Sequence, residues 1–248
     1  MTLTLPKQLV FLPGIGADHR LFKHQTEVFP NSYAADWIDP LPGESLEQYA
    51  VRFAETIRSE LEKRPAASVV VCGLSLGGMI APYVARELGA SGCILLCSVR
   101  SPKEFPRLGY PDWLLMRLCP PLRLVRIRML QLGARFLLLF PGLLQKFVSP
   151  KVLRQFAEMP PSRFAGLARM MFDWAFRHRS PEENDEKIFD KPILHVHGTN
   201  DWLLPIYRTH PDIRIEGGGH LLVLTHPNEI NVIIERFVSE RLPSEPVA

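Results

Sequence analysis

A serine between two glycines is the clearest chemical signal in the sequence. Residues 73–77 read Gly-Leu-Ser-Leu-Gly, directly after the apolar run 69–72 and directly before a helical pattern that begins at Met79. A serine on so tight a strand-to-helix turn has a strained backbone, and the flanking glycines leave room for the neighbouring strand and helix. The sequence therefore predicts Ser75 as a nucleophile held out in a cleft. The alternative is a glycine-rich turn with an incidental serine.

A serine hydroxyl attacks a carbonyl at neutral pH only when a base takes its proton and a further group orients that base. His220 follows three consecutive glycines, residues 217–219, in a loop after the last apolar run. Asp201 ends the pentapeptide His-Gly-Thr-Asn-Asp, just beyond the preceding run. The chain order is serine, acid, histidine, as expected when the three come from successive strand ends. We therefore predict a catalytic triad of Ser75, Asp201 and His220.

The negative charge that develops on a substrate carbonyl oxygen needs two N–H donors. Residues 12–16, Leu-Pro-Gly-Ile-Gly, follow the first apolar run, and their loop is expected to open into the same crevice as the Ser75 turn. The amides of Ile15 and Leu76 are the predicted oxyanion donors. Leu76 also begins the helix after the nucleophile, whose positive end favours an anion. The alternative for residues 13–16 is a plain turn.

Histidines and cysteines elsewhere in the chain do not indicate a metal site. His195 and His197 alternate on one apolar run like a His-x-His ligand pair, but no further cluster of ligands accompanies them, which favours a structural role. The 4 cysteines include no Cys-x-x-Cys pair, and Cys72, Cys93 and Cys97 lie in apolar runs, as reduced core thiols do. We therefore predict no metal ion and no cofactor.

Strand-like and helix-like patterns alternate along most of the chain. Apolar, β-branched runs occupy residues 9–12, 33–38, 69–72, 93–97, 193–196 and 213–215, and helical patterns occupy residues 46–61 and 79–88. Such alternation is typical of a parallel sheet with covered faces, the α/β class. It stops between residues 101 and 180, where helical pieces punctuated by prolines follow one another. Ser149 before Pro150 and Ser162 after Pro161 predict helix starts there, because serine caps free amides and proline suits the first turn.

Charge is spread unevenly along the chain. The formal net charge of +3 is too small to indicate nucleic-acid binding. Residues 101–180, however, carry a charge of about +10, which leaves about −7 for the rest. Cations interleaved with apolar runs predict a surface for an anionic substrate group or an acidic lipid. The alternative is that arginine stems cover apolar surface while their charged heads stay in water.

The length and the first residues bear on organisation and location. A chain of 248 residues holds one large domain, or one domain with a smaller one inserted. Residues 1–12 lack the basic start of a signal peptide. The uncharged run 68–85 approaches the ~18 residues of a membrane span but is interrupted by glycines and a proline. We therefore expect a cytoplasmic protein without a transmembrane segment.

These motifs resemble those of the α/β-hydrolase superfamily, over residues 8–96 and 192–237. In this resemblance Ser75 corresponds to the nucleophile, Asp201 to the acid and His220 to the base. Ile15 corresponds to the oxyanion donor of a loop in which the family usually has histidine, whereas this chain has Pro13.

The resemblance also implies an architecture. The family's usual first two strands are missing, so we expect a six-stranded parallel sheet flanked by helices. The hydrolase core then comprises residues 1–100 and 181–248. Residues 101–180 form a helical cap inserted before the acid-bearing strand.

A serine triad with an oxyanion hole transfers acyl groups to water. We therefore predict a serine hydrolase that cleaves a small ester or thioester through an acyl-enzyme on Ser75. The resemblance also admits iminopeptidase and carbon-carbon hydrolase activities, which residues of the cap decide. Dehalogenase and epoxide hydrolase relatives carry a carboxylate at the nucleophile position, and Ser75 argues against both. A catalytically silent protein that binds lipid or ligand on this fold is the alternative from another class.

Overall fold

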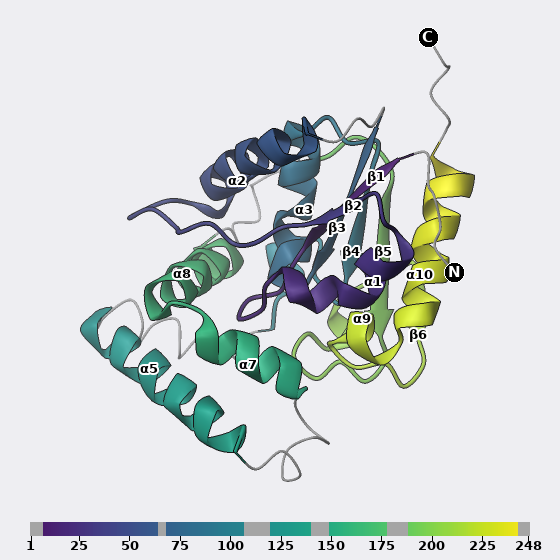
Figure 1. The fold of residues 1–248 in the computed structure, drawn as a ribbon. Coiled ribbons are helices and arrows are strands. Elements are labelled where there is room, and N and C mark those ends of the chain that lie inside the picture. Colours follow the sequence, from purple (N-terminus) through teal and green to yellow (C-terminus); the bar gives the residue numbers. More distant parts are fainter. Residues whose placement is uncertain (1–6, 64–67, 107–119, 140–148, 178–187, 243–248) are drawn as a thin grey trace.

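The computed structural model describes residues 7–63, 68–106, 120–139, 149–177 and 188–242 (Figure 1). The strands are β1 (Gln8–Leu12), β2 (Ser32–Ala34), β3 (Val69–Leu74), β4 (Gly92–Leu96), β5 (Ile193–Gly198) and β6 (Ile213–Ile215). The α-helices are α1 (Lys23–Val28), α2 (Leu46–Leu61), α3 (Leu76–Glu87), α5 (Pro120–Leu137), α7 (Pro150–Glu158), α8 (Pro161–Arg177), α9 (Leu222–Thr225) and α10 (Pro227–Arg236). Shorter helical turns are η1 (His19–Phe22), η2 (Pro102–Glu104), η4 (Ile206–Arg208) and η5 (Phe237–Arg241).

Six strands form one sheet in the order β2-β1-β3-β4-β5-β6, and every neighbouring pair is parallel. The predicted six-stranded parallel sheet is therefore confirmed. β1 lies between β2 and β3, so the chain first adds a strand on one side of β1 and then continues on the other. The loops after β1 and β3 leave the sheet at this switch point, where ligands of open α/β sheets bind.

Strand β2 is shorter than predicted. We expected a strand over residues 33–38, but β2 ends at Ala34. β2 pairs with β1, and the last residue pair is Phe11 with Ala34. β1 itself ends one residue later, at Leu12. Beyond β2, the Trp37 indole donates a hydrogen bond to the Gly14 carbonyl 3.2 Å away. The chain therefore leaves the sheet where its partner strand runs out and follows the loop after β1.

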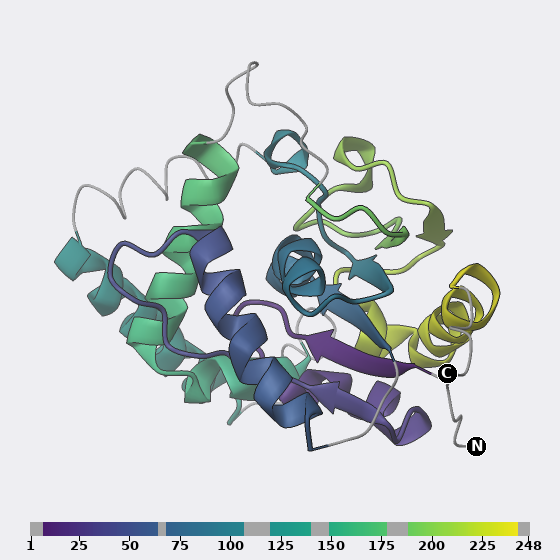
Figure 2. The ribbon, with the colours of Figure 1, turned by 90° about the horizontal axis from the view of Figure 1, so that it is seen from above.

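Two hydrophobic layers cover the sheet. Val10 and Leu12 of β1 pack with buried residues of α2 and α3, whereas Leu9 and Phe11 pack with those of α9 and α10. Successive side chains of a strand point to opposite faces, and both faces of a parallel sheet are covered. Figures 1 and 2 show α2 and α10 on opposite sides of the sheet. The sheet, packed on both faces, is the rigid support from which the loops after β1, β3, β5 and β6 extend.

The described residues between β4 and β5 form helices and no strand. α7 begins at Pro150, directly after Ser149 as predicted, although the Ser149 side chain makes no capping hydrogen bond. α8 begins at Pro161, so Ser162 lies inside the first turn rather than before it. The stretch is helical as expected, while the division of the chain into core and cap domains remains a prediction.

Helices α7 and α8 contact the rest of the molecule directly, whereas α5 lies farthest from the sheet (Figure 1). Trp174 of α8 donates a hydrogen bond to the Tyr83 hydroxyl of α3 at 3.2 Å. Phe156 of α7 and Phe164 of α8 lie against Gly16, where an added Cβ would be 3.3 Å and 3.5 Å from their rings. The two helices therefore cover the loop that follows β1.

Candidate active site

The turn at Ser75 is strained and tightly packed. Ser75 has φ 55° and ψ −119°, a combination that residues with a side chain rarely adopt. A Cβ on Gly73 would lie 2.2 Å from the Gly77 carbonyl oxygen, and a Cβ on Gly77 would lie 2.2 Å from the Leu12 carbonyl oxygen. The Ser75 amide donates to the Leu96 carbonyl at 3.0 Å. Because neither glycine tolerates a side chain, the motif is required by the backbone geometry.

Ser98 contacts this turn from the loop that follows the neighbouring strand β4, and the sequence did not predict this contact. Its buried hydroxyl donates a hydrogen bond of 2.7 Å to the Ser75 carbonyl. Gly78 makes room for it, since a Cβ there would lie 2.5 Å from the Ser98 Cβ. Ser98 is 23 residues from Ser75 in the chain, and only the pairing of β3 with β4 brings the two together. No local pattern could have identified it.

The loop after β1 lies against the Ser75 turn. A Cβ on Gly14 would be 3.4 Å from the Ser75 Cβ. Ile15 follows Gly14 and is partly buried against the core, and Leu76 is the first residue of α3. The two predicted oxyanion donors therefore belong to adjacent segments. Their action on a substrate oxygen remains a prediction.

A hydrogen bond joins Asp201 to His220. The distance from His220 Nδ1 to Asp201 Oδ2 is 2.8 Å. The loops after β5 and β6 meet closely, since a Cβ on Gly198 would lie 2.2 Å from the Gly218 carbonyl oxygen. The same carbonyl accepts a hydrogen bond of 2.8 Å from the Asn200 amide. The structure thus brings together the predicted acid and the predicted base.

The Asp201 carboxylate is buried and receives several donors. The amides of Leu203 and Leu204 both donate to Oδ1 at 3.0 Å, and His197 Nε2 lies 3.3 Å from Oδ2. Burial by itself would raise the pKa of Asp201, but the hydrogen bonds from His197, His220 and the Leu204 amide outweigh it. They hold the pKa well below the usual range of aspartate. Asp201 is therefore a fixed anion facing the His220 ring.

His195 and His197 form a buried pair behind Asp201. His197 Nε2 lies 2.7 Å from the Leu204 carbonyl, which can only accept, so Nε2 carries the proton. His197 Nδ1 is then free to accept a hydrogen bond from His195 Nε2, 3.3 Å away. Each ring thus contacts the other, whereas His195 Nδ1 is buried without a hydrogen-bond partner in the part of the chain that the structure describes. The structural role predicted for the two histidines agrees with their contacts. The contact of His197 with Asp201 was not predicted.

Among the described residues, no hydrogen bond joins the Ser75 hydroxyl to His220. Cys97 directly follows β4, the strand that lies between β3 and β5 in the sheet, and has φ 42°. Its thiol donates a hydrogen bond of 3.5 Å to the carbonyl of Gly219, the residue before His220. Burial and the nearby Asp201 raise the pKa of the Cys97 thiol, which leaves it protonated and unreactive. Cys72, Cys93 and Cys97 are free and buried, and Cys119 lies outside the described residues.

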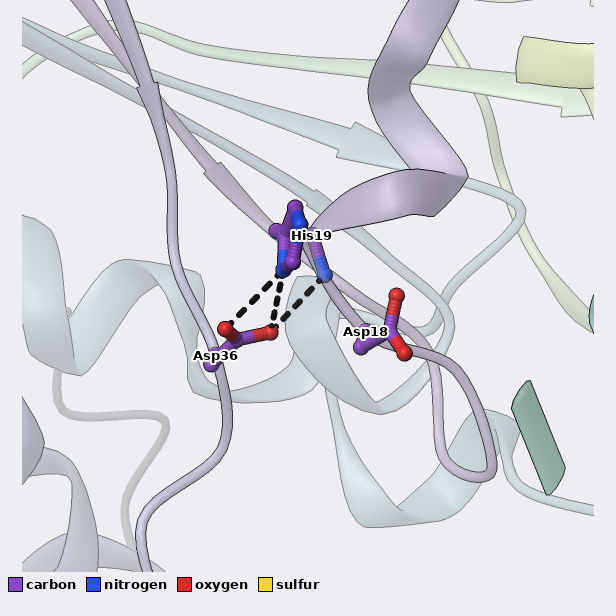
Figure 3. A group of neighbouring side chains, drawn as sticks. All are labelled: Asp18, His19 and Asp36. Atoms are coloured by element: carbon purple, nitrogen blue, oxygen red, sulfur yellow. Dashed lines mark hydrogen bonds and ion pairs between the residues drawn. The ribbon is translucent and has the colours of Figure 1, made fainter. Parts of the chain in front are cut away.

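A second group of polar side chains lies on the surface at η1 (Figure 3). Asp18, His19 and Asp36 each place a potential metal ligand within 4.8 Å of the others. The carboxylates already have partners, however. His19 Nδ1 lies 2.8 Å from Asp36 Oδ1, and Arg20 Nη2 lies 2.6 Å from Asp18 Oδ2. A network of surface ion pairs accounts for this cluster, and we assign no ion to it.

The parallel sheet, the strained serine turn after β3 and the Asp–His pair after β5 and β6 define an α/β hydrolase. The profile of the alpha/beta hydrolase family matches residues 9–231, and the chain belongs to this family. A comparison with curated protein sequences found no significant match.

Several solved structures share the fold. An N-acyl homoserine lactonase is 16% identical with a TM-score of 0.66, over 98% of this chain and 92% of its own. A thermophilic esterase from Thermogutta terrifontis is 19% identical with a TM-score of 0.64, over 96% and 91%. MenH from S. aureus is 19% identical with a TM-score of 0.64, over 96% and 95%. At such identities the likeness concerns the fold.

Proposed function

We propose that this chain is a serine hydrolase that cleaves a small ester or thioester through an acyl-enzyme on Ser75. The observation that carries the proposal is the 2.8 Å hydrogen bond between His220 Nδ1 and Asp201 Oδ2, at the sheet edge where β3 presents Ser75 on its strained turn. A histidine oriented by a buried carboxylate is the base that a serine hydroxyl needs. The esterase and the lactonase among the structures of similar fold act on bonds of this kind.

In the first half of the proposed reaction, Ser75 Oγ attacks the carbonyl carbon and its proton passes to His220 Nε2. The carbonyl oxygen becomes an oxyanion, which accepts hydrogen bonds from the amides of Ile15 and Leu76. The bond from carbon to the leaving oxygen or sulfur then breaks, and His220 returns the proton to the leaving group. An acyl ester of Ser75 remains.

In the second half, water attacks the acyl carbon while His220 takes its proton. The bond between the acyl carbon and Ser75 Oγ then breaks, His220 returns the proton to Ser75 Oγ, and the carboxylic acid product leaves. Asp201 stays ionised throughout because His197, the Leu204 amide and His220 hold its pKa low. The carboxylate therefore stabilises the positive imidazole ring that forms in each half.

A labelling experiment tests the proposal. Purified protein should react with a fluorophosphonate probe and hydrolyse p-nitrophenyl butyrate. Ser75→Ala should abolish labelling and lower kcat by about a thousandfold or more, because only binding and the oxyanion hole would remain. The matched control is Ser59→Ala, since Ser59 is an exposed serine of α2 whose hydroxyl donates a hydrogen bond to the Thr56 carbonyl.

Two outcomes would contradict the proposal. Unchanged hydrolysis by Ser75→Ala would assign the chemistry to another group. Failure of the parent protein to label, with no hydrolysis of any ester or thioester offered, would favour the catalytically silent binding protein.

A further inference from the structure

Helix α5 is apolar on two opposite sides. Its inner side buries Ile127 and Ala134 against α7 and α8. Its outer side exposes Val125 (57%), Met129 (63%), Leu132 (56%), Phe136 (60%) and, just past the last turn, Leu139 (71%). The spacing of four, three, four and three residues places these five in a single row along the helix. We call this row the α5 ridge.

The α5 ridge is bordered by positive charge. α5 contains four arginines and no acidic residue. Arg128 and Arg135, seven residues or about two helical turns apart, line a pocket of about 310 Å³ that Leu132 of the ridge also lines, so the pocket opens beside the ridge. Arg135 is held in place by a hydrogen bond of 3.1 Å to the Ala157 carbonyl. Within the described part of the chain, the Arg128 side chain has neither an ion pair nor a hydrogen bond.

The acidic group in this pocket does not cancel that charge. Glu158 lines the pocket, but its Oε2 lies 2.6 Å from Arg20 Nη2. Arg20 also pairs with Asp18, so these three groups together carry a charge of −1, against +2 for Arg128 and Arg135. The pocket therefore keeps a net positive charge, in a place that an apolar ridge adjoins.

We propose that α5 docks on an anionic phospholipid surface. The α5 ridge enters the boundary between headgroups and acyl chains, and the pocket of Arg128 and Arg135 receives a lipid phosphate. A helix with an apolar row and arginines beside it lies in the plane of such an interface. Among the described residues, no helix has the length and apolar content needed to cross a membrane, so the docked helix rests on the surface.

The same features disfavour other occupants. Two copies of α5 placed face to face would bring arginines against arginines, with no acid on either helix to pair with them. The ridge spans four turns of a helix that stands outermost in the fold, as Figure 1 shows, and therefore presents a convex row rather than a groove. A protruding row can enter a planar lipid surface along its whole length. A protein partner would have to offer a groove to receive it.

Vesicle sedimentation tests this proposal and does not depend on catalysis. The full-length protein should sediment with vesicles of phosphatidylcholine and phosphatidylglycerol, but not with vesicles of phosphatidylcholine alone. Met129→Glu and Leu132→Glu should each abolish sedimentation. Arg128→Gln and Arg135→Gln should each weaken it roughly fivefold. Added salt should weaken binding of the parent protein, because exposed charges are screened over about 8 Å at physiological ionic strength.

Matched variants on the far side of the sheet serve as controls. Val232→Glu changes an exposed valine of α10, and Lys23→Gln removes an exposed cation of α1. Both should bind vesicles like the parent protein. Near-ultraviolet circular dichroism and thermal unfolding show whether the ridge variants stay folded, which we expect because their side chains face solvent.

Three results would overturn the proposal. Equal sedimentation with both kinds of vesicle would show that the anionic headgroup is not recognised. Absence of sedimentation with either kind would remove the lipid surface altogether. Concentration-dependent dimerisation that Met129→Glu abolishes, without vesicle binding by the parent, would make a second copy the occupant of the ridge.

Discussion

His195 is a buried base that the fold keeps uncharged. Burial chiefly, together with the neighbouring His197 and Arg100, lowers the pKa of His195 to about 3. In an unfolded chain a histidine has a pKa of about 6.5. Between these two values the unfolded chain takes up a proton at this residue and the folded protein does not. The free energy of unfolding therefore falls as the pH drops from about 6.5 toward 3.

A substitution at His195 tests whether this residue makes the free energy of unfolding fall as the pH drops. In the parent protein, His195 should lower the free energy of unfolding by up to about 1.4 kcal/mol for each pH unit below pH ~6.5. His195→Phe lacks the titrating group, so its unfolding free energy should decline less steeply over the same range. Urea unfolding at several pH values between about 6.5 and 4 measures both slopes. Parallel slopes for the two proteins would contradict a neutral His195, whatever the offset between them.

At the scale of elements, the strand-turn-helix unit of β3 and α3 depends on close backbone approach. Gly77 stands where a Cβ would meet the Leu12 carbonyl oxygen, which belongs to the neighbouring strand and cannot rotate away. Relief requires a shift of β1 or of α3 within a packed core, and packed cores resist such shifts. The same contact keeps the loop after β1 beside Ser75, so stability and the site depend on one residue.

Gly77→Ala should therefore destabilise the protein by about 3 kcal/mol or more. The matched control is Gly133→Ala in α5, where a Cβ meets no atom within 4 Å. That substitution should stabilise the protein by about 0.5 to 1 kcal/mol, because alanine favours a helix interior over glycine. Urea unfolding of the three proteins supplies the comparison. A Gly77→Ala variant as stable as the parent would mean that the turn can open without cost.

At the scale of the whole molecule, charge is divided between two parts of the chain. Residues 101–180 carry about +10 and the rest about −7. Some of these charges form ion pairs between the two parts, as in the 2.7 Å contact between Arg163 Nε and Asp39 Oδ1. The remaining positive charge raises the local concentration of anions near the helices that cover the loop after β1.

We expect the proposed hydrolase to prefer anionic substrates for this reason. At low salt, kcat/KM should be several-fold higher for an anionic acyl thioester than for a neutral one of equal chain length. The ratio should approach one as salt is added, because the charges involved are exposed and screened. The two substrates are compared in one assay at increasing sodium chloride. A ratio that stays near one at low salt would leave the basic helices without influence on substrate choice.

The sequence by itself determined the features that depend on local backbone geometry and on alternation. Glycines must flank Ser75 at positions 73 and 77 because the tight turn admits no side chain at either position, so their spacing can be read without a structure. The strands could be read in the same way, since both faces of a parallel sheet are buried and its strands are continuous apolar runs. The carboxyl ends of such strands share one edge, and for this reason Asp201 and His220 could be predicted to meet.

Only the tertiary structure decided the features that depend on residues far apart in the chain. The end of β2 at Ala34 follows from the length of its partner strand. The contact of Ser98 with Ser75, 23 residues apart, follows from the pairing of β3 with β4, for which the sequence carries no local signal. The exposed side of α5 has the same origin: an apolar residue such as Met129 looks like core in the sequence, and only the placement of α7 and α8 on the other side of the helix leaves it facing solvent.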